Sequence, residues 1–244
     1  GVIYLADAET GCPLAVLDSV EISRVRTGAA SAVAAKHLAR PESALMAVVG
    51  TGTQARTQIE AIRQVLPITR VQLVGRSMER TRERAADFAK TLGLDVVPCA
   101  SVTDALKGAD VLVTATPARG PLVSLRDVPP GLFIAAVGAD SPGKQELSAE
   151  LTAHCTVVAD VARQCVAVGE LQHPIREGLM SQEMIHAELG AILCEDRPGR
   201  TSDDEITLYD STGTALQDVA VGFEVTTAAR ARGLGQSVQL GALA

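Results

Sequence analysis

One short segment decides the fold of this chain: Val48-Val49-Gly50-Thr51-Gly52-Thr53-Gln54-Ala55. It follows an apolar run over residues 45–49 that predicts a buried strand, and it opens a segment with helical spacing. Gly50, Gly52 and Ala55 fit the pattern G-x-G-x-x-A, in which the first glycine permits a tight turn and the second lets backbone approach a pyrophosphate. The small third residue lets the helix pack closely on the strand. Between a strand and a helix, this pattern predicts a dinucleotide-binding loop that holds the anion with backbone N–H groups; a mere tight turn is the alternative interpretation.

Strands and helices are predicted to alternate along the chain after this loop. Short apolar segments typical of buried strands cover residues 70–74, 95–98, 111–114, 132–137, 155–159 and 206–209, and helical spacing covers residues 54–65, 78–92 and 102–107. Continuous apolar strands that alternate with amphipathic helices predict an α/β architecture, a doubly wound parallel sheet of the Rossmann type covered on both faces. Residues 172–178 and 197–204 are predicted to be loops.

The two ends of the chain predict a second, smaller domain. Its segments are a hairpin and two helices, over residues 2–7, 13–18, 20–38 and 214–232. We expect residues 1–40 and 209–244 to form a smaller α+β substrate and dimerisation domain, incomplete at its N-terminus. We expect residues 41–208 to form the NAD(P)-binding Rossmann domain.

Composition limits the classes of partner. The 244 residues are 47% hydrophobic and carry a formal net charge of −7. This charge argues against a nucleic acid partner, because binding phosphates needs a basic field. No apolar run approaches the roughly 18–20 residues that span a bilayer, so no membrane partner is expected. The five scattered cysteines lack CxxC spacing, which predicts reduced thiols in a cytoplasmic protein, and the four histidines lack zinc-site spacing, so no metal is expected.

The end of the second strand in the α/β pattern bears on the choice of cofactor. An acidic residue at this position binds the ribose 2′-hydroxyl of NAD, whereas an arginine accommodates the 2′-phosphate of NADP. This chain has Gly75-Arg76-Ser77 and no acid. Arg76 and Ser77 therefore favour NADP(H), with NAD(H) as the alternative. In a second interpretation, Arg76 is a solvated surface residue or stacks on the adenine without selecting phosphate.

Three charged residues are candidates for ligand contacts. Arg26 lies among small residues of a predicted helix, where a long guanidinium could grip a carboxylate at two points, although a solvent-facing arginine fits the spacing equally well. Asp140 follows a predicted strand at the edge where open α/β sheets bind ligands, and it could exchange a proton with a substrate nitrogen. Alternatively, Asp140 caps a helix near Glu146. Lys144 could bind a cofactor phosphate or be a surface charge.

Four segments match one known protein family in the family's own order, across nearly the whole chain. They are residues 26–29 (Arg-Thr-Gly-Ala), 50–55 (Gly-Thr-Gly-Thr-Gln-Ala), 138–147 (Gly-Ala-Asp-Ser-Pro-Gly-Lys-Gln-Glu-Leu) and 206–218 (Ile-Thr-Leu-Tyr-Asp-Ser-Thr-Gly-Thr-Ala-Leu-Gln-Asp). Through them the chain resembles the ornithine cyclodeaminase/mu-crystallin family, which also holds an alanine dehydrogenase and reductases of cyclic ketimines. Four such segments are a far more specific signal than a glycine loop alone.

The resemblance implies roles for the matching positions. Arg26 would bind the substrate carboxylate, and Asp140 would exchange a proton at the substrate nitrogen. Thr53 and Gln54 would touch the cofactor pyrophosphate, and Arg76 would lie where the family recognises the ribose. Further cofactor contacts would come from Thr114, Val137, Lys144 and Ser211, which join Gly50, Gly52, Ala55 and Ser77 in the candidate cofactor site. The smaller domain would bind a small imino or amino acid and form a homodimer.

The family also carries an arginine and a catalytic lysine before the position of Gly1. This chain starts at Gly1 without Met, directly in a predicted strand. Either the sequence is a fragment of a longer protein, which the start at Gly1 favours, or it is a truncated and inactive product. A lysine a short distance upstream of Gly1 would restore the family's catalytic set.

Within the family, three features favour a reductase. Residues 138–142 resemble the reductase and dehydrogenase version of this loop, the chain stops soon after its last predicted helix, and Arg76 favours NADPH. Residues 208–213 also resemble bacterial reductases of Δ1-pyrroline-2-carboxylate and Δ1-piperideine-2-carboxylate. The expected reaction is the reduction of such a cyclic imine to L-proline or L-pipecolate. The alternatives are an ornithine cyclodeaminase, which forms L-proline and ammonia from L-ornithine, and a non-catalytic NADPH-binding protein like mu-crystallin.

Overall fold

The computed structural model describes residues 1–239, and the chain divides into two compact units. Unit 1 contains residues 1–26 and the segment from residue 215 on, and unit 2 contains residues 27–214. The division falls after residues 26 and 214, not after residues 40 and 208 as the sequence predicts. The reason is that the second half of helix α1 (Val20–Leu38) and strand β12 (Thr207–Asp210) pack within unit 2.

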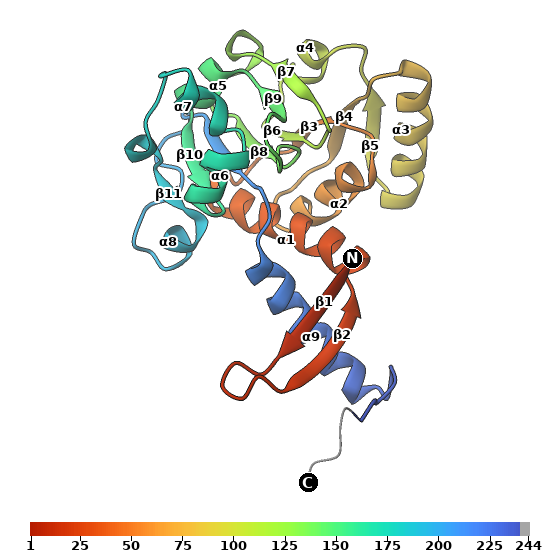
Figure 1. Cartoon of the computed structure of the whole chain (residues 1–244). Helices are drawn as coiled ribbons and strands as arrows, with labels where there is room; N and C mark the ends of the chain where they lie inside the picture. Colours follow the sequence, from red (N-terminus) through yellow and green to blue (C-terminus); the bar gives the residue numbers. More distant parts are fainter. Residues whose placement is uncertain (240–244) are drawn as a thin grey trace. The chain divides into compact units, whose positions relative to one another are not determined.

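In the described part of the chain, unit 2 is built on an eight-stranded sheet in which all neighbouring strands are parallel (Figure 1). Besides β12 its strands are β3 (Leu45–Val49), β4 (Arg70–Val74), β5 (Asp95–Pro98), β6 (Val111–Thr114), β8 (Phe133–Ala136), β10 (Thr156–Ala159) and β11 (Ala187–Glu188). The order across the sheet is β11-β10-β12-β8-β6-β3-β4-β5. The chain order reverses between β3 and β6, and open α/β sheets bind ligands outside the carboxyl ends of the strands at such a point.

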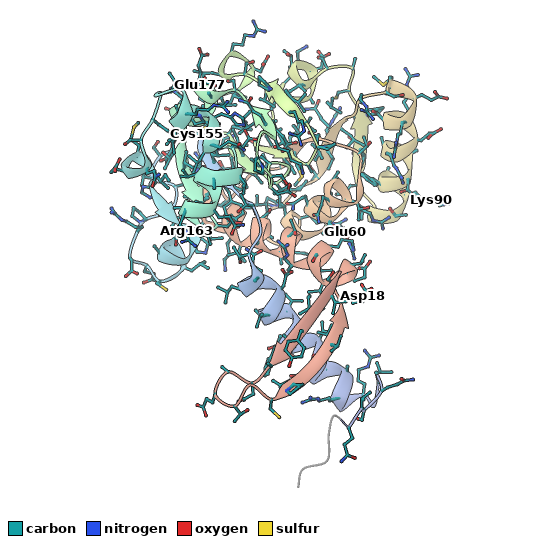
Figure 2. All side chains as sticks on the ribbon, viewed as in Figure 1. Asp18, Glu60, Lys90, Cys155, Arg163 and Glu177 are labelled. Carbon is teal, nitrogen blue, oxygen red and sulfur yellow. The ribbon has the colours of Figure 1, made fainter. Side chains whose placement is uncertain are left out.

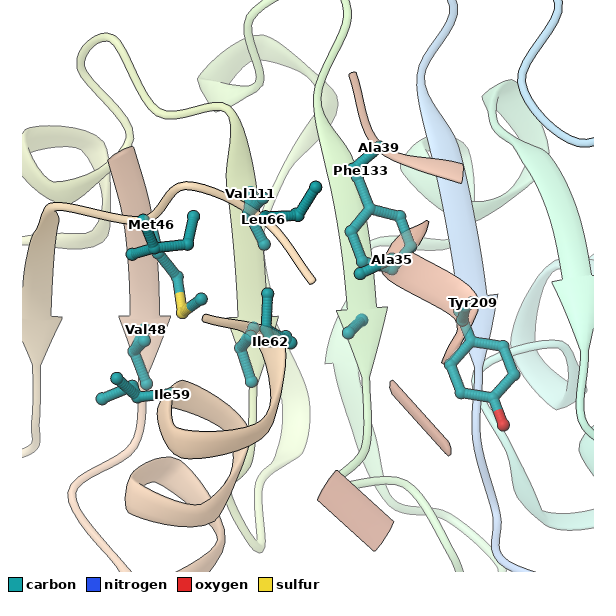
Figure 3. Packing of buried hydrophobic residues seen from close by; sticks show 14 of the residues in the cluster. Ala35, Ala39, Met46, Val48, Ile59, Ile62, Leu66, Val111, Phe133 and Tyr209 are labelled. Atoms are coloured by element: carbon teal, nitrogen blue, oxygen red, sulfur yellow. The ribbon is translucent and has the colours of Figure 1, made fainter. Parts of the chain in front are cut away.

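Helices cover both faces of this sheet. One face is covered by α1, α2 (Thr53–Ile62), α3 (Met78–Leu92) and α8 (Leu189–Leu193), and the other by α4 (Val102–Ala105), α5 (Ala149–His154), α6 (Ala162–Val168) and α7 (Gln172–Arg176). Side chains alternate between the faces, as strand geometry requires. Met46 and Val48 lie beside Ile59 of α2 (Figure 3), whereas Ala47 and Val49 pack in the opposite cluster. The apolar strands predicted from sequence are therefore buried on both faces.

The structure confirms the α/β architecture and the strands and helices predicted around the glycine loop, to within a few residues at their ends. The prediction of a loop over residues 172–178 is wrong, because α7 occupies the first part of this segment. The buried His173 anchors α7, since its Nε2 lies 2.7 Å from the carbonyl oxygen of Lys144. The sequence pattern also fails to predict β11 and the parallel pair β7 (Arg119–Val123) and β9 (Gln145–Leu147). These strands are short, and several of their residues are polar.

Unit 1 packs a hairpin against a helix. Strands β1 (Val2–Ala6) and β2 (Pro13–Asp18) pair antiparallel, as predicted, and α9 (Ala215–Ala231) lies against them. Ile3 and Leu5 point toward α9, where a Cβ on Gly222 would lie 3.3 Å from Leu17. The helix can approach this closely because Gly222 has no side chain. No helix among residues 1–239 has the length and apolar character needed to cross a membrane.

Gly50 is a point of close approach in the loop after β3. Its φ is +125°, and a Cβ there would lie 2.6 Å from the carbonyl oxygen of Ala115, which follows β6. Its N–H donates to the carbonyl oxygen of Val74 in β4 (2.9 Å). Only glycine combines this backbone conformation with such an approach.

We expect Gly50→Ala to lower the free energy of unfolding by at least about 2 kcal/mol, because it adds backbone strain and a clash with Ala115. Gly52→Ala is the matched control, since nothing lies within 4 Å of a Cβ built at Gly52 and its φ is −85°. Urea denaturation of both variants measures the difference. Equal stability of the two would contradict the prediction.

Candidate functional site

The N-terminus of α2 is open to an anion. Its N-cap residue, Gly52, has no side chain to accept a hydrogen bond from the first N–H groups of the helix. By contrast, Ser77 caps α3 and Ser148 caps α5 through their hydroxyl groups. Gly52 and Thr53 are exposed. Uncapped N–H groups at a helix N-terminus bind phosphate well, so this loop fits a pyrophosphate.

Two neighbouring residues of α2 support the same fit. Ala55 is fully buried in the core between helix and sheet, as the third position of the glycine pattern requires. The side-chain oxygen Oε1 of Gln54 is buried and has no hydrogen-bond partner in the described part of the chain. A buried acceptor without a donor is costly, and a hydroxyl or amide group of a bound dinucleotide would satisfy it, whereas the pyrophosphate itself offers only acceptors.

The end of β4 packs tightly on the glycine loop. A Cβ on Gly75 would lie 2.6 Å from the side chain of Thr51. The next residue, Arg76, is exposed and forms no ion pair with the residues that the structure describes. The Ser77 hydroxyl accepts the N–H of Arg80 (3.5 Å), which makes Ser77 the cap of α3. Of the two residues predicted to recognise the ribose end, Arg76 is thus the one that no ion pair or cap holds among residues 1–239.

The ends of β6, β8 and β12 lie side by side. The N–H of Val137 donates to the carbonyl oxygen of Thr114 (2.9 Å), and the N–H of Ser211 donates to that of Ala136 (3.0 Å). Thr114 is fully buried, Ser211 is nearly so, and Val137 is partly exposed. The structure therefore brings these three candidate residues to one edge of the sheet, together with the glycine loop, because all of these strands are parallel.

Asp140 and Lys144 form an ion pair beyond the end of β8. The Lys144 Nζ lies 2.5 Å from Asp140 Oδ1, which also accepts a hydrogen bond from the Ser141 hydroxyl (2.9 Å). The Asp140 side chain is 49% exposed. The alternative in which Asp140 caps a helix near Glu146 is wrong, because residues Gln145–Leu147 form β9. Asp140 is thus a solvent-accessible carboxylate, which a ligand or water can reach for proton exchange.

Arg26 belongs to unit 1, whereas the other candidate residues belong to unit 2. Its Nε donates to Asp218 Oδ1 (2.9 Å) and its Nη1 to Gln217 Oε1 (3.2 Å). The Arg26 side chain is only 15% exposed. The interpretation of Arg26 as a solvent-facing residue is therefore wrong, and the guanidinium is already oriented by a carboxylate.

The structure contains a series of three fully buried carboxyl groups that the predictions above do not include: Asp210, Glu170 and Glu146. Asp210 accepts the N–H groups of Glu170 and Leu171, both at 3.1 Å. Glu170 accepts the N–H groups of Glu146 (2.7 Å) and Leu147 (3.1 Å). We call these residues the carboxylate series. The available sequence signal is a pair of glycines, Gly138 and Gly169. A Cβ on Gly138 would meet the carboxyl group of Glu146, and a Cβ on Gly169 would meet that of Asp210.

Glu146 ends the series at the loops after β6 and β8. Its Oε1 accepts the N–H of Thr116 (2.7 Å), and its Oε2 accepts the N–H of Gly138 (2.9 Å). A Cβ on Gly138 would lie 2.4 Å from this carboxyl group, so only glycine fits there.

Burial changes the proton affinity of the carboxylate series. Removal from water raises the pKa of Asp210 to about 7, against the opposing effect of its two backbone N–H partners. Burial also raises the pKa of Glu146, and it raises the pKa of Glu170 well above its usual range, with the nearby Asp210 charge adding to the effect. Asp160, whose Oδ1 accepts a hydrogen bond from the Cys165 thiol (3.1 Å), further raises the pKa of Asp210.

No group of three His, Cys, Asp or Glu side chains suited to a metal ion occurs among residues 1–239.

These directions predict a pH-dependent stability. A raised pKa means that the folded state holds protons that the unfolded chain has released, so this stabilisation is present below about pH 4 and is lost as the pH rises through about 7. We expect the free energy of unfolding to fall from about pH 5 to pH 8, by up to about 1.4 kcal/mol per pH unit for each proton involved. Asp210→Asn should flatten this slope, as measured by urea denaturation across the range.

The control for this prediction is Asp196→Asn at an exposed position, which should keep the slope of the parent protein. A slope that Asp210→Asn leaves unchanged would contradict the prediction.

Two curated relatives resemble this chain over nearly its full length. It is 39% identical to the alanine dehydrogenase of Archaeoglobus fulgidus over 239 residues, which are 97% of this chain and 73% of the relative. It is 36% identical to the Δ1-pyrroline-2-carboxylate reductase of Bacillus cereus over 241 residues, 98% of this chain and 74% of the relative. The chain thus spans about three quarters of the length of these relatives.

A solved structure and a family model agree with these relatives. The Δ1-pyrroline-2-carboxylate reductase of Thermococcus litoralis, in complex with NADH and L-proline, matches with a TM-score of 0.93 and 33% identity over 97% of this chain and 74% of that one. The model of the ornithine cyclodeaminase/mu-crystallin family matches residues 1–232. The resemblance of the four sequence segments is confirmed, and the chain belongs to the ornithine cyclodeaminase/mu-crystallin family.

Proposed function

We propose that this chain is an NAD(P)H-dependent reductase of a small cyclic imine carboxylate, Δ1-pyrroline-2-carboxylate or Δ1-piperideine-2-carboxylate, with L-proline or L-pipecolate as the product. The observation that carries the proposal is the uncapped N-terminus of α2 behind Gly50 and Gly52, at the point where the strand order reverses. The names of the Bacillus cereus and Thermococcus litoralis relatives support the choice of substrate.

The cofactor, when bound, supplies the hydride that reduces the C=N bond. The backbone N–H groups at the start of α2 would hold its pyrophosphate, and the buried Oε1 of Gln54 would accept a hydrogen bond from a hydroxyl or amide group elsewhere on the cofactor. Thr53, Thr114, Val137, Lys144 and Ser211 are proposed as further contacts. Holding both reactants in place accounts for much of the rate acceleration.

Arg26 and Asp140 act on the substrate in this proposal. A guanidinium has five N–H donors, and the bonds to Asp218 and Gln217 use two of those on Arg26, so the others can bind the substrate carboxylate. Asp140 exchanges the proton at the imine nitrogen, directly or through water, while Lys144 neutralises the carboxylate between turnovers.

We propose the remaining assignments on the same basis. Unit 1 would serve substrate binding and dimerisation, since its hairpin and α9 expose the apolar side chains of Val2, Tyr4, Val16 and Phe223. A homodimer would cover this apolar surface. Five free cysteines support a reducing, cytoplasmic location.

We expect the full protein to oxidise NADPH or NADH when either imine is added, measured as loss of the nicotinamide absorbance. Asp140→Asn should lower kcat about a hundredfold or more, because it removes the proton-exchanging group, whereas Asp196→Asn should retain activity. Release of ammonia from L-ornithine without net absorbance change would instead identify a cyclodeaminase. Oxidation with pyruvate and ammonia alone would identify an alanine dehydrogenase, and cofactor binding without any turnover a mu-crystallin-like protein.

We further propose NADP(H) as the preferred cofactor and NAD(H) as the alternative, because Arg76 is exposed and residues 75–77 contain no acid. Arg76→Ala should raise the dissociation constant for NADPH about tenfold or more, as expected for a lost charge-assisted contact, and leave that for NADH within about twofold. Arg82→Ala, at an exposed position of α3, is the control. An equal loss for both cofactors would indicate adenine stacking and contradict selection of phosphate.

A further inference from the structure

We propose that Glu146 is a positioning residue of the cofactor edge, by which we mean the ends of β3, β6, β8 and β12 and the loops that follow them. The carboxylate series fixes the loops after β6 and β8 relative to each other through paired backbone hydrogen bonds. Glu170 and Asp210 act through Glu146. The inference deepens the proposed function and rests on it for the part that concerns the cofactor.

A single carboxylate joins two loops that have separate roles. The loop after β6 contains Ala115, whose carbonyl oxygen sets the close approach of Gly50, and the next residue, Thr116, donates its N–H to Glu146 Oε1. The loop after β8 leads to Asp140, and its residue Gly138 donates its N–H to Glu146 Oε2. A shift of the Glu146 carboxyl group would therefore move the support of the glycine loop and the segment that carries Asp140.

The position of Glu146 is itself fixed by the other two residues of the carboxylate series. Both oxygens of Glu170 accept N–H groups of β9, those of Glu146 and Leu147. Both oxygens of Asp210 accept N–H groups of the segment that carries Glu170. Asp210 lies in β12 in register with Ala136 of β8, so the series starts and ends at neighbouring strands and forms a closed ring. No link can move without breaking two hydrogen bonds.

The chemistry of the links explains why all three residues are acids. In its ionised form a carboxyl group has two acceptor oxygens and no donor, so it matches a pair of N–H groups. For Asp210 this form prevails above its pKa of about 7. Hydrogen bonds to a charged acceptor are shorter and stronger than neutral ones. The amide of Asn or Gln has one acceptor, and its NH₂ group would face one of the N–H donors. In the described part of the chain, none of the three carboxyl groups has an ion-pair partner within 4.0 Å.

Stability alone does not account for such an arrangement. Burial of a carboxyl group without a cation is expensive, and well-packed apolar residues in place of buried charged groups are often as stable or more so. Three such groups in succession end at the loops of one sheet edge. We explain their presence by the fixed position that they give to these loops. This explanation predicts that a substitution in the series loosens the loops at the sheet edge, even where the altered side chain does not itself contact them.

The test uses Glu146→Gln in the full protein, with Glu177→Gln as the matched control at an exposed position (Figure 2). Native-state hydrogen exchange should become about tenfold faster or more at the N–H groups of Thr116 and Gly138, with little change in the core strands β3 and β10, because only the local bonds are lost. The dissociation constants for NADH and NADPH, measured by nicotinamide fluorescence, should rise about tenfold. Unchanged exchange at both N–H groups would overturn the proposal, as would cofactor affinity within about twofold of the parent protein.

A second variant separates positioning from simple loss of structure. Among residues 1–239, the Glu170 carboxyl group accepts hydrogen bonds from β9 and from neither loop. Glu170→Gln should therefore speed exchange at Thr116 and Gly138 only if it acts through Glu146, and unchanged exchange there would overturn the series. This variant also carries the test if Glu146→Gln fails to fold. A parent protein that binds neither nicotinamide cofactor would contradict the proposed function, whereas the exchange measurement tests the carboxylate series without any cofactor.

Discussion

The contact between Gly50 and the carbonyl oxygen of Ala115 is the constraint on which the candidate site depends. A parallel sheet brings the ends of β3 and β6 next to each other. The segments that follow the two strands therefore start side by side, only one strand spacing apart. A residue with a Cβ at position 50 would collide with Ala115, so only glycine permits this turn. Because the turn is this tight, α2 begins directly behind β3, and its N-terminal N–H groups are left at the edge of the sheet without a capping side chain.

The interior behind this edge combines apolar and polar interactions in the same residues. The side chains of Leu147 and Leu171 are fully buried in one apolar cluster, while their N–H groups donate to Glu170 and Asp210. Apolar burial thus supplies stabilisation, and the carboxylates supply partners for backbone groups that have no strand or helix to pair with. This division explains how irregular segments such as residues 169–171 can be buried beside a parallel sheet.

The sequence predicts the central elements well because their signals are local. The helix over residues 78–92 is found with its bounds unchanged, since Ser77 caps its first turn and Gly93, with a φ of +64°, ends it. The carboxylate series escapes prediction because its partners are distant in sequence: Glu170 and Asp210 pair with N–H groups 24 and 40 residues away. In a single sequence such acids look like surface residues. The same lack of distant information allowed the interpretation of Asp140 as a helix cap.

The cofactor edge alone does not decide the substrate. The relatives named alanine dehydrogenase and Δ1-pyrroline-2-carboxylate reductase are almost equally similar to this chain, at 39% and 36% identity. Alanine and the cyclic imine share a carboxylate next to a carbon–nitrogen bond, and an arginine with a proton-exchanging acid would serve either of them. Ring size changes only the carbon skeleton, which contacts neither group through charge. Under the roles proposed for Arg26 and Asp140, the choice between these substrates would come from apolar contacts with the carbon skeleton.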